Sequence, residues 1–84
     1  MSKKLKQDIS IGANLKKHRK NAKLSQEVVA ARLQSQGLEI SREILSQMEL
    51  GKYSIRVSVL LALVKLYDTP VQAFFEGIGV DVEL

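Results

Sequence analysis

The sequence predicts an all-α fold of four or five short helices in one small domain. Apolar residues recur at the spacing of a helical face, and serine or threonine precedes several of these stretches, as a helix N-cap does. No convincing strand pattern occurs before residue 78. Because the chain has only 84 residues, we expect a modest core and little room for a deep substrate pocket.

The first helix is expected over residues 8–22, after a flexible basic arm at 1–7. The apolar residues of this helix recur at intervals of three or four and are Ile11, Leu15, His18 and Ala22. The single histidine of the chain thus lies on the face expected to meet the core. We interpret it as a half-buried core residue.

The next two helices are joined by a turn that contains glycine. Ser25 is expected to cap the second helix and Gly37 to terminate it, while the third helix is expected to run from its N-cap Ser41 to Gly51. The residues expected to face inward are Val29, Ala30, Leu33, Leu45 and Met48. Two short helices joined in this way match the helix-turn-helix plan, in which the second of them enters the major groove of DNA.

A fourth helix, expected over residues 54–68, is apolar on nearly all sides, which predicts burial on all sides. The stripe expected to face the core is Val57, Leu60, Leu61, Val64 and Tyr67. The stripe expected to meet a second subunit is Val59, Leu63 and Leu66. A fifth helix is expected to start at Thr69-Pro70 and to end at Gly77, with Phe74 and Phe75 divided between the core and the subunit interface.

Residues 78–84 form a tail in which apolar and other side chains alternate, as they do in a strand. The tail either pairs with the tail of a partner or frays, as chain ends often do.

Charge is distributed unevenly along the chain, whose formal net charge is +4. Residues 1–23 carry eight bases and one acid, whereas residues 68–84 carry four acids and no base. A basic end of this kind indicates either a polyanionic partner or a solvated face. Neither a signal-peptide pattern nor an apolar run long enough for a membrane span is found, so a cytoplasmic protein without a membrane segment is expected.

An enzyme is not expected from this composition. The chain has one histidine and no cysteine, so His18 is the only conventional general base. No cluster of histidine, cysteine and carboxylate has the spacing of a zinc site. We therefore expect neither a metal nor a cofactor.

The outward side of the predicted third helix carries side chains that are suited to reading base edges. Arg pairs with guanine, Gln with adenine, and Glu accepts from cytosine. The side chains are Arg42, Glu43, Ser46 and Gln47. On spacing alone, a helical bundle with a polar third helix is an equally good interpretation.

Two motifs carry a family resemblance. Leu24-Ser25-Gln26-Glu27 at the start of the second helix, together with Glu49-x-Gly51 at the end of the third, resembles the phage-repressor/Cro-like helix-turn-helix family, also called the XRE family. The similarity covers about residues 9–77 and includes Leu66-Tyr67-Asp68-Thr69-Pro70-Val71 after the fourth helix. It implies a five-helix, lambda-repressor-like domain that binds double-stranded DNA as a homodimer on a pseudo-palindromic site.

The resemblance also implies roles for single residues. Arg42, Glu43 and Gln47 match base-contacting positions, and Ser46 is a weaker reader. Gln26 matches a residue that touches phosphate and steadies a base-reading side chain. The lysines that we expect at DNA phosphates are Lys16, Lys17, Lys20, Lys23 and Lys52.

Arg19 and Glu49 match a buried ion pair of the family that ties the first helix to the third. The alternative is an exposed pair, which would contribute less than about 1 kcal/mol.

Three features depart from the family pattern. About five extra residues lie between Leu33 and Ile40, and because a helical turn takes about 3.6 residues we predict a second helix extended to about Gln36. Leu50 stands where family members often have a polar residue that contacts phosphate. Ile44 is apolar where the side chain normally faces outward, so it either packs under the longer turn or contacts a thymine methyl.

The expected function is sequence-specific DNA binding by a transcriptional regulator, a repressor, that acts as a homodimer through the helix at about 42–49. The residues assigned to the dimer interface are Val59, Leu63, Leu66 and Phe75. The alternative is a protein-interaction module on the same scaffold, such as an antitoxin-like binder of a regulatory protein partner. Glu43 and Ile44 favour this alternative slightly, whereas Arg42, Gln47 and the basic first helix oppose it.

Overall fold

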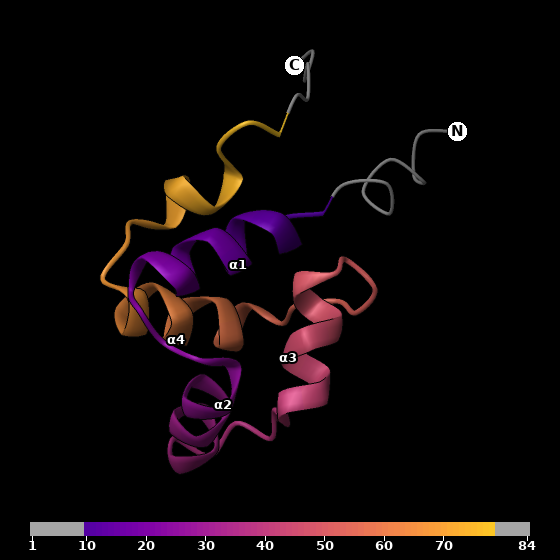
Figure 1. The fold of residues 1–84 in the computed structure, drawn as a ribbon, viewed down its shortest axis with the longest axis vertical. Coiled ribbons are helices and arrows are strands. Elements are labelled where there is room, and N and C mark those ends of the chain that lie inside the picture. Colours follow the sequence, from indigo (N-terminus) through magenta and orange to yellow (C-terminus); the bar gives the residue numbers. More distant parts are fainter. Residues whose placement is uncertain (1–9, 79–84) are drawn as a thin grey trace.

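A computed structural model describes residues 10–78, and all regular structure in that range is helical. The elements in chain order are α1 (Gly12–Asn21), α2 (Gln26–Ser35), α3 (Arg42–Glu49), α4 (Val57–Tyr67) and the 3₁₀ helix η2 (Val71–Phe75). Helix α3 packs against α1 and α2, and η2 packs against α1 and α4 (Figure 1). Helix α1 also packs against α4, so it contacts α3, α4 and η2. Within residues 10–78, no helix combines the length and apolar character needed to cross a membrane.

The fifth predicted helix is present as a 3₁₀ helix of five residues rather than as an α-helix. Pro70 occupies the N-cap position instead of the first helical position, and the Thr69 hydroxyl donates to the carbonyl of Tyr67 instead of capping η2. A short 3₁₀ turn suffices here because η2 has only to bring Phe74 into the core, where that side chain is fully buried.

One apolar core lies between the five elements and contains the predicted inward faces of α1, α2 and α3. Leu15, Val29, Leu33 and Leu45 have no exposed surface, and Met48 is 1% exposed. At about 25 cal/mol for each Å² of apolar surface, the burial of side chains of this size dominates the stability of such a domain.

Local signals set the starts of α2 and α3 as predicted. The Ser25 hydroxyl accepts from the Val28 amide at 3.1 Å, and the Ser41 hydroxyl accepts from the Ile44 amide at the same distance. Each serine thereby satisfies one of the amide groups that the first turn of a helix leaves without a helical partner.

The ends of α2 and α3 also follow the prediction. Gly37 and Gly51 adopt φ values of 86° and 79°, which only glycine reaches without strain. The amide of the residue after each glycine reaches back to a carbonyl of the last turn, from Leu38 to Leu33 and from Lys52 to Gln47, as in a Schellman motif. Helix α2 ends at Ser35 with Gln36 as its C-cap, within one residue of the predicted end.

Two other helices start later than predicted. Helix α1 begins at Gly12, after Ser10 and Ile11 have a non-helical conformation, because the Ser10 hydroxyl accepts from the Gly12 amide. Helix α4 begins at Val57 rather than at 54, since the connection after α3 continues to Arg56. The predicted arm at 1–7 and the predicted tail beyond Ile78 lie outside the described residues.

Side chains of α1 hold η2 in place. Asn14 Nδ2 donates to the carbonyls of Phe74 and Glu76, both at 2.8 Å. His18 Nε2 lies 3.2 Å from the carbonyl oxygen of Ala73, and its ring meets that of Phe74 edge to face with 5.3 Å between the centroids. His18 is half-buried, as predicted, and it packs between α1 and η2.

The predicted division of α4 into two stripes is partly wrong, although Leu60 and Val64 pack against the core as predicted. Val59 and Leu63, which were assigned to a subunit interface, are fully buried in the core of the same chain, whereas Val57 and Leu61, which were assigned to the core, are 69% and 53% exposed. Tyr67 is buried as predicted. Both stripes are apolar, so their composition did not reveal which of them α1, α2 and η2 would cover.

Candidate nucleic-acid interface

Helix α3 divides cleanly into an inward and an outward side. Leu45 and Met48 are buried, whereas Arg42, Glu43 and Gln47 are exposed, which places three of the four predicted base-reading side chains at the surface. The fourth, Ser46, is half-buried, and Ile44 packs against the core, which agrees with the packing alternative for that residue. The outward side of α3 therefore offers a cation, a carboxylate and an amide, which can each bond a base edge.

The connection between α2 and α3 is an ordered turn. Ile40 is 2% exposed, and Leu38 packs against the same core. Gln34 Nε2 donates to the carbonyl of Ile40 at 2.9 Å, across the connection. The extra residues of this connection are thus tied to α2 by a hydrogen bond and to the core by two apolar side chains.

Beneath this surface lies the predicted ion pair. Arg19 Nε donates to Glu49 Oε2 at 2.7 Å and Arg19 Nη2 to Glu49 Oε1 at 3.1 Å, so the pair is bidentate. Both residues are buried, and Arg19 Nη1 also donates to the carbonyl of Leu24. The hydrogen bond to Glu49 raises the pKa of Arg19 above its ordinary value. Removing one partner would leave a buried charge uncompensated, which destabilises proteins by about 3–5 kcal/mol.

Gln26 joins this pair from the start of α2. Its Nε2 donates to Glu49 Oε1 at 2.9 Å, so one carboxylate connects α1, α2 and α3. Gln26 is half-buried, and its hydrogen bond to Glu49 forms within the protein alone. The sequence indicated Gln26 and Glu49 separately, but no spacing rule connected the two.

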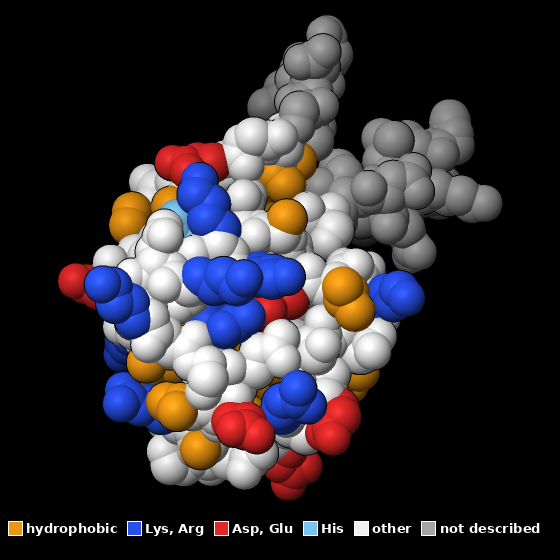
Figure 2. All heavy atoms as spheres, in the orientation of Figure 1, with side chains coloured by type: hydrophobic (Ala, Val, Ile, Leu, Met, Phe, Trp, Pro, Cys, Tyr) orange, Lys and Arg blue, Asp and Glu red, His pale blue; other side chains and the backbone are white. Residues whose placement is uncertain are grey.

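The five lysines expected at DNA phosphates are all exposed. Figure 2 shows Lys and Arg side chains gathered over the middle of the face where α1 and α3 meet, and carboxylates along the edge near α2 and the start of α3. The exposed carboxylates of these segments are Glu27, Glu39 and Glu43. A polyanion on this face would therefore be attracted most strongly to the α1 side.

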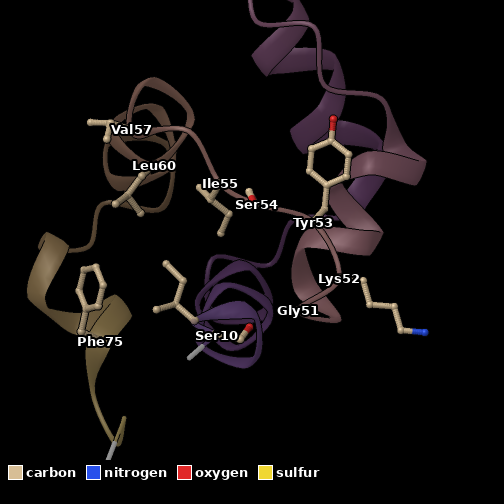
Figure 3. Close-up of a pocket in the computed structure, with 10 residues that line it drawn as sticks. Ser10, Gly51, Lys52, Tyr53, Ser54, Ile55, Val57, Leu60 and Phe75 are labelled. Carbon is tan, nitrogen blue, oxygen red and sulfur yellow. The ribbon is translucent and has the colours of Figure 1, made fainter. Parts of the chain in front are cut away.

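A hollow of about 540 Å³ opens on another part of the surface, between the start of α1, the connection after α3, the start of α4, and η2. Figure 3 shows Ile55, Leu60 and Phe75 around this hollow, while Lys52 points away from it. Phe75 is 49% exposed, and it is the only residue of the predicted interface with a largely open side chain, since Leu66 is half-buried. The sequence did not indicate Ile11 and Ile55 as lining residues, because they belong to segments that are far apart along the chain.

Among residues 10–78, no three His, Asp or Glu side chains lie close enough together to hold a metal ion.

The chain was also compared with known proteins. The model of the helix-turn-helix domain family matches residues 10–74, which includes every described helix except the last residue of η2. No curated protein and no solved structure matches the chain. The matched range, with α2 and α3 at its centre, shows that the chain belongs to the helix-turn-helix domain family.

Proposed function

We propose that the protein is a sequence-specific DNA-binding transcriptional regulator that places α3 in the major groove. The observation that carries this proposal is the outward row of Arg42, Glu43 and Gln47 on a helix whose other side is anchored in the core. A groove of about 12 Å admits one helix, and these side-chain types bond base edges. The lysines of α1 and Lys52 supply the attraction to phosphate.

Within this class we propose a repressor. The resemblance to phage repressors and Cro supports this choice, because a protein seated on an operator excludes other proteins from the same DNA.

A binding selection on random duplex DNA, repeated over a range of salt concentrations, tests the proposal. If the protein neutralises about six phosphates, the slope of log K against log salt is expected to be near −5. Arg42→Glu is expected to abolish binding to the selected sequence, whereas Arg32→Glu, which reverses another exposed arginine in the last turn of α2, is expected to leave base readout unchanged. Binding without salt dependence, or equal loss in both variants, would contradict the proposal.

We further propose that the regulator binds as a homodimer and that the second copy covers the hollow beside Phe75. Val57 and Phe75 are exposed at its edge, and large apolar side chains in this state favour a protein contact. The neighbouring charges support self-association: Arg56 immediately precedes α4 and its exposed Val57, whereas Glu76 follows Phe75. A two-fold axis brings one patch against itself, so opposite charges on its two sides can meet.

Sedimentation equilibrium tests the dimer. The wild type is expected to dimerise at micromolar concentration and Val57→Glu to be monomeric, with Val28→Glu as a control at an exposed valine of α2 that is not part of the hollow. A wild type that stays monomeric with and without DNA would contradict the dimer. In a dimer bound to DNA, the two copies of α3 are expected to lie about 34 Å apart.

A protein-interaction module remains the second candidate, and one observation favours it. Leu50 and Tyr53 are 61% and 50% exposed just after α3, where a DNA-binding surface is usually polar. If Arg42→Glu leaves the affinity for a partner protein unchanged and no duplex sequence is selected, this candidate replaces the first.

A further inference from the structure

We propose that Glu49 is a positioning residue for the carboxamide of Gln26, and that it thereby fixes how the start of α2 meets DNA. The proposal rests on the proposed DNA-binding function. The carrying observation is the 2.9 Å hydrogen bond from Gln26 Nε2 to Glu49 Oε1, in addition to the ion pair that Glu49 forms with Arg19.

The orientation of the Gln26 amide follows from the chemistry of its partner. Glu49 is buried, and both of its carboxylate oxygens accept hydrogen bonds from the guanidinium of Arg19, so they act as acceptors toward Gln26 as well. If the Gln26 amide were turned over, its carbonyl oxygen would lie against the carboxylate oxygen of Glu49 and would be repelled by it. The amide of Gln26 therefore has one favourable orientation, with Nε2 toward Glu49.

This orientation fixes the two remaining hydrogen-bonding groups of Gln26. A carboxamide is planar, so one N–H toward Glu49 sets the directions of the second N–H and of Oε1. Gln26 is the first residue of α2, and the Ser25 cap holds the backbone at this point. The second N–H is thus a preset donor beside a helix start, where the helix dipole also favours a phosphate.

The ion pair is also connected to the backbone just before α2. Arg19 donates to both oxygens of Glu49 and also to the carbonyl of Leu24, just before the Ser25 cap. A free glutamine would lose side-chain rotamer freedom when it bound DNA, and this network removes that loss beforehand.

Nuclear magnetic resonance of the wild type tests the positioning without any substitution. One of the two Gln26 Nε2 protons is expected to exchange with solvent at least about tenfold more slowly than those of the exposed Gln47. Gln34, whose Nε2 donates to Ile40, is the internal reference for a bonded amide. Exchange at Gln26 as fast as at Gln47 would overturn the proposal.

A double-mutant cycle tests the consequence for DNA binding. In the wild-type background, Gln26→Ala is expected to weaken binding to the selected duplex about tenfold. The double substitution Arg19→Met with Glu49→Leu replaces the buried pair with apolar side chains, an exchange that folded proteins often tolerate. In that background Gln26→Ala is expected to change the affinity less than about twofold.

An equal loss from Gln26→Ala in both backgrounds would mean that Glu49 only supports the fold, and would overturn the proposal. If the apolar double variant does not fold, Glu49→Gln takes its place. The shortest bond from Arg19 favours the single oxygen of the new glutamine at the place of Glu49 Oε2, so its NH2 group takes the place of Oε1 and faces Gln26. The Gln26 amide is then expected to reverse and the DNA affinity to fall as in Gln26→Ala. Unchanged affinity in Glu49→Gln would count against the proposal.

The experiments distinguish a failure of the proposed DNA-binding function from a failure of the proposed positioning of Gln26 by Glu49. If the wild type selects no duplex sequence while its Gln26 amide is protected, the DNA-binding function is wrong and the positioning by Glu49 stands. If DNA binding is specific while the amide is unprotected, the function stands and the positioning is wrong.

Discussion

Gly12 lies against the carbonyl oxygen of Met48, so closely that a Cβ atom on Gly12 would stand 2.5 Å from that oxygen. The carbonyl of Glu49 is nearly as close, at 2.6 Å. Both oxygens belong to the backbone of α3, so neither can move aside as a flexible side chain would. The start of α1 and the end of α3 are therefore in direct backbone contact.

This contact predicts the effect of Gly12→Ala. The added methyl group has to push α1 away from α3, and overpacking of this kind destabilises proteins by about 1–3 kcal/mol. Urea denaturation measures the change in the free energy of unfolding. Ala13→Met, which enlarges the next and exposed residue of α1, is the control and is expected to stay within about 0.5 kcal/mol of the wild type. Equal stability of Gly12→Ala and the wild type would refute the contact.

Tyr67 predicts a stabilising substitution. Its hydroxyl is buried and has no hydrogen-bond partner among the described residues, so Tyr67→Phe removes an unsatisfied group and is expected to raise the free energy of unfolding by about 1 kcal/mol. The exposed Tyr53 offers the control Tyr53→Phe, which is expected to change nothing. A lower stability of Tyr67→Phe would show that the hydroxyl is bonded in solution.

The same residue predicts a pH dependence. Burial raises the pKa of Tyr67 above the ordinary value of about 10, so the folded state keeps this proton at a pH where the unfolded state loses it. The wild type therefore loses stability as the pH rises above about 10. The Tyr67→Phe variant lacks this loss, so its advantage over the wild type is expected to grow between about pH 8 and 11. A constant difference over that range would contradict the raised pKa.

Lys23 combines an unfavourable conformation with a predicted DNA contact. Its φ is 62°, which costs a side-chain-bearing residue roughly 1 kcal/mol, so Lys23→Gly is expected to stabilise the fold by up to that amount. If Lys23 also contacts phosphate, the same variant is expected to reduce the salt slope of DNA binding by about 1 for each bound subunit, which is about 2 for the proposed dimer. Lys23→Asn keeps a residue that tolerates this conformation and separates the two effects: the salt slope falls as in Lys23→Gly, with less gain in stability. Reduced stability of Lys23→Gly would contradict the assigned backbone conformation.

Asn14 predicts a local effect on η2. Asn14→Ala removes two hydrogen bonds to the carbonyls of Phe74 and Glu76, and is expected to destabilise the domain by about 1–2 kcal/mol. Hydrogen exchange is expected to accelerate in η2 before it does in α2 or α3. Asn21→Ala, at the exposed last residue of α1, is the control. Uniform acceleration over all helices would contradict a role confined to η2.

The helix caps of α2 and α3 are local signals in the sequence. Ser25, Ser41, Gly37 and Gly51 were predicted correctly because each acts on backbone groups within a few residues, so the chain around it supplies the partner. The start of α4 was predicted three residues too early, because the connection after α3 continues to Arg56, which precedes the helix in an extended conformation.

Some features of the candidate site could likewise be predicted from the sequence, and others could not. The outward row on α3 followed from helical spacing, and the pair of Arg19 and Glu49 followed from the resemblance to a family. The hydrogen bond from Gln26 to Glu49 could not be predicted from the sequence, because it spans 23 positions and depends on the packing of α2 against α3.

The sequence by itself determined an all-helical domain, the caps of α2 and α3, and the polar side of α3, because helix period and capping act over one or two turns. Only the tertiary structure decided which side of α4 became core. Val59 and Val57 are equally apolar, yet one has no exposed surface and the other is 69% exposed. The difference arises because α1, α2 and η2 approach α4 from one direction, and that direction is a property of the packed molecule.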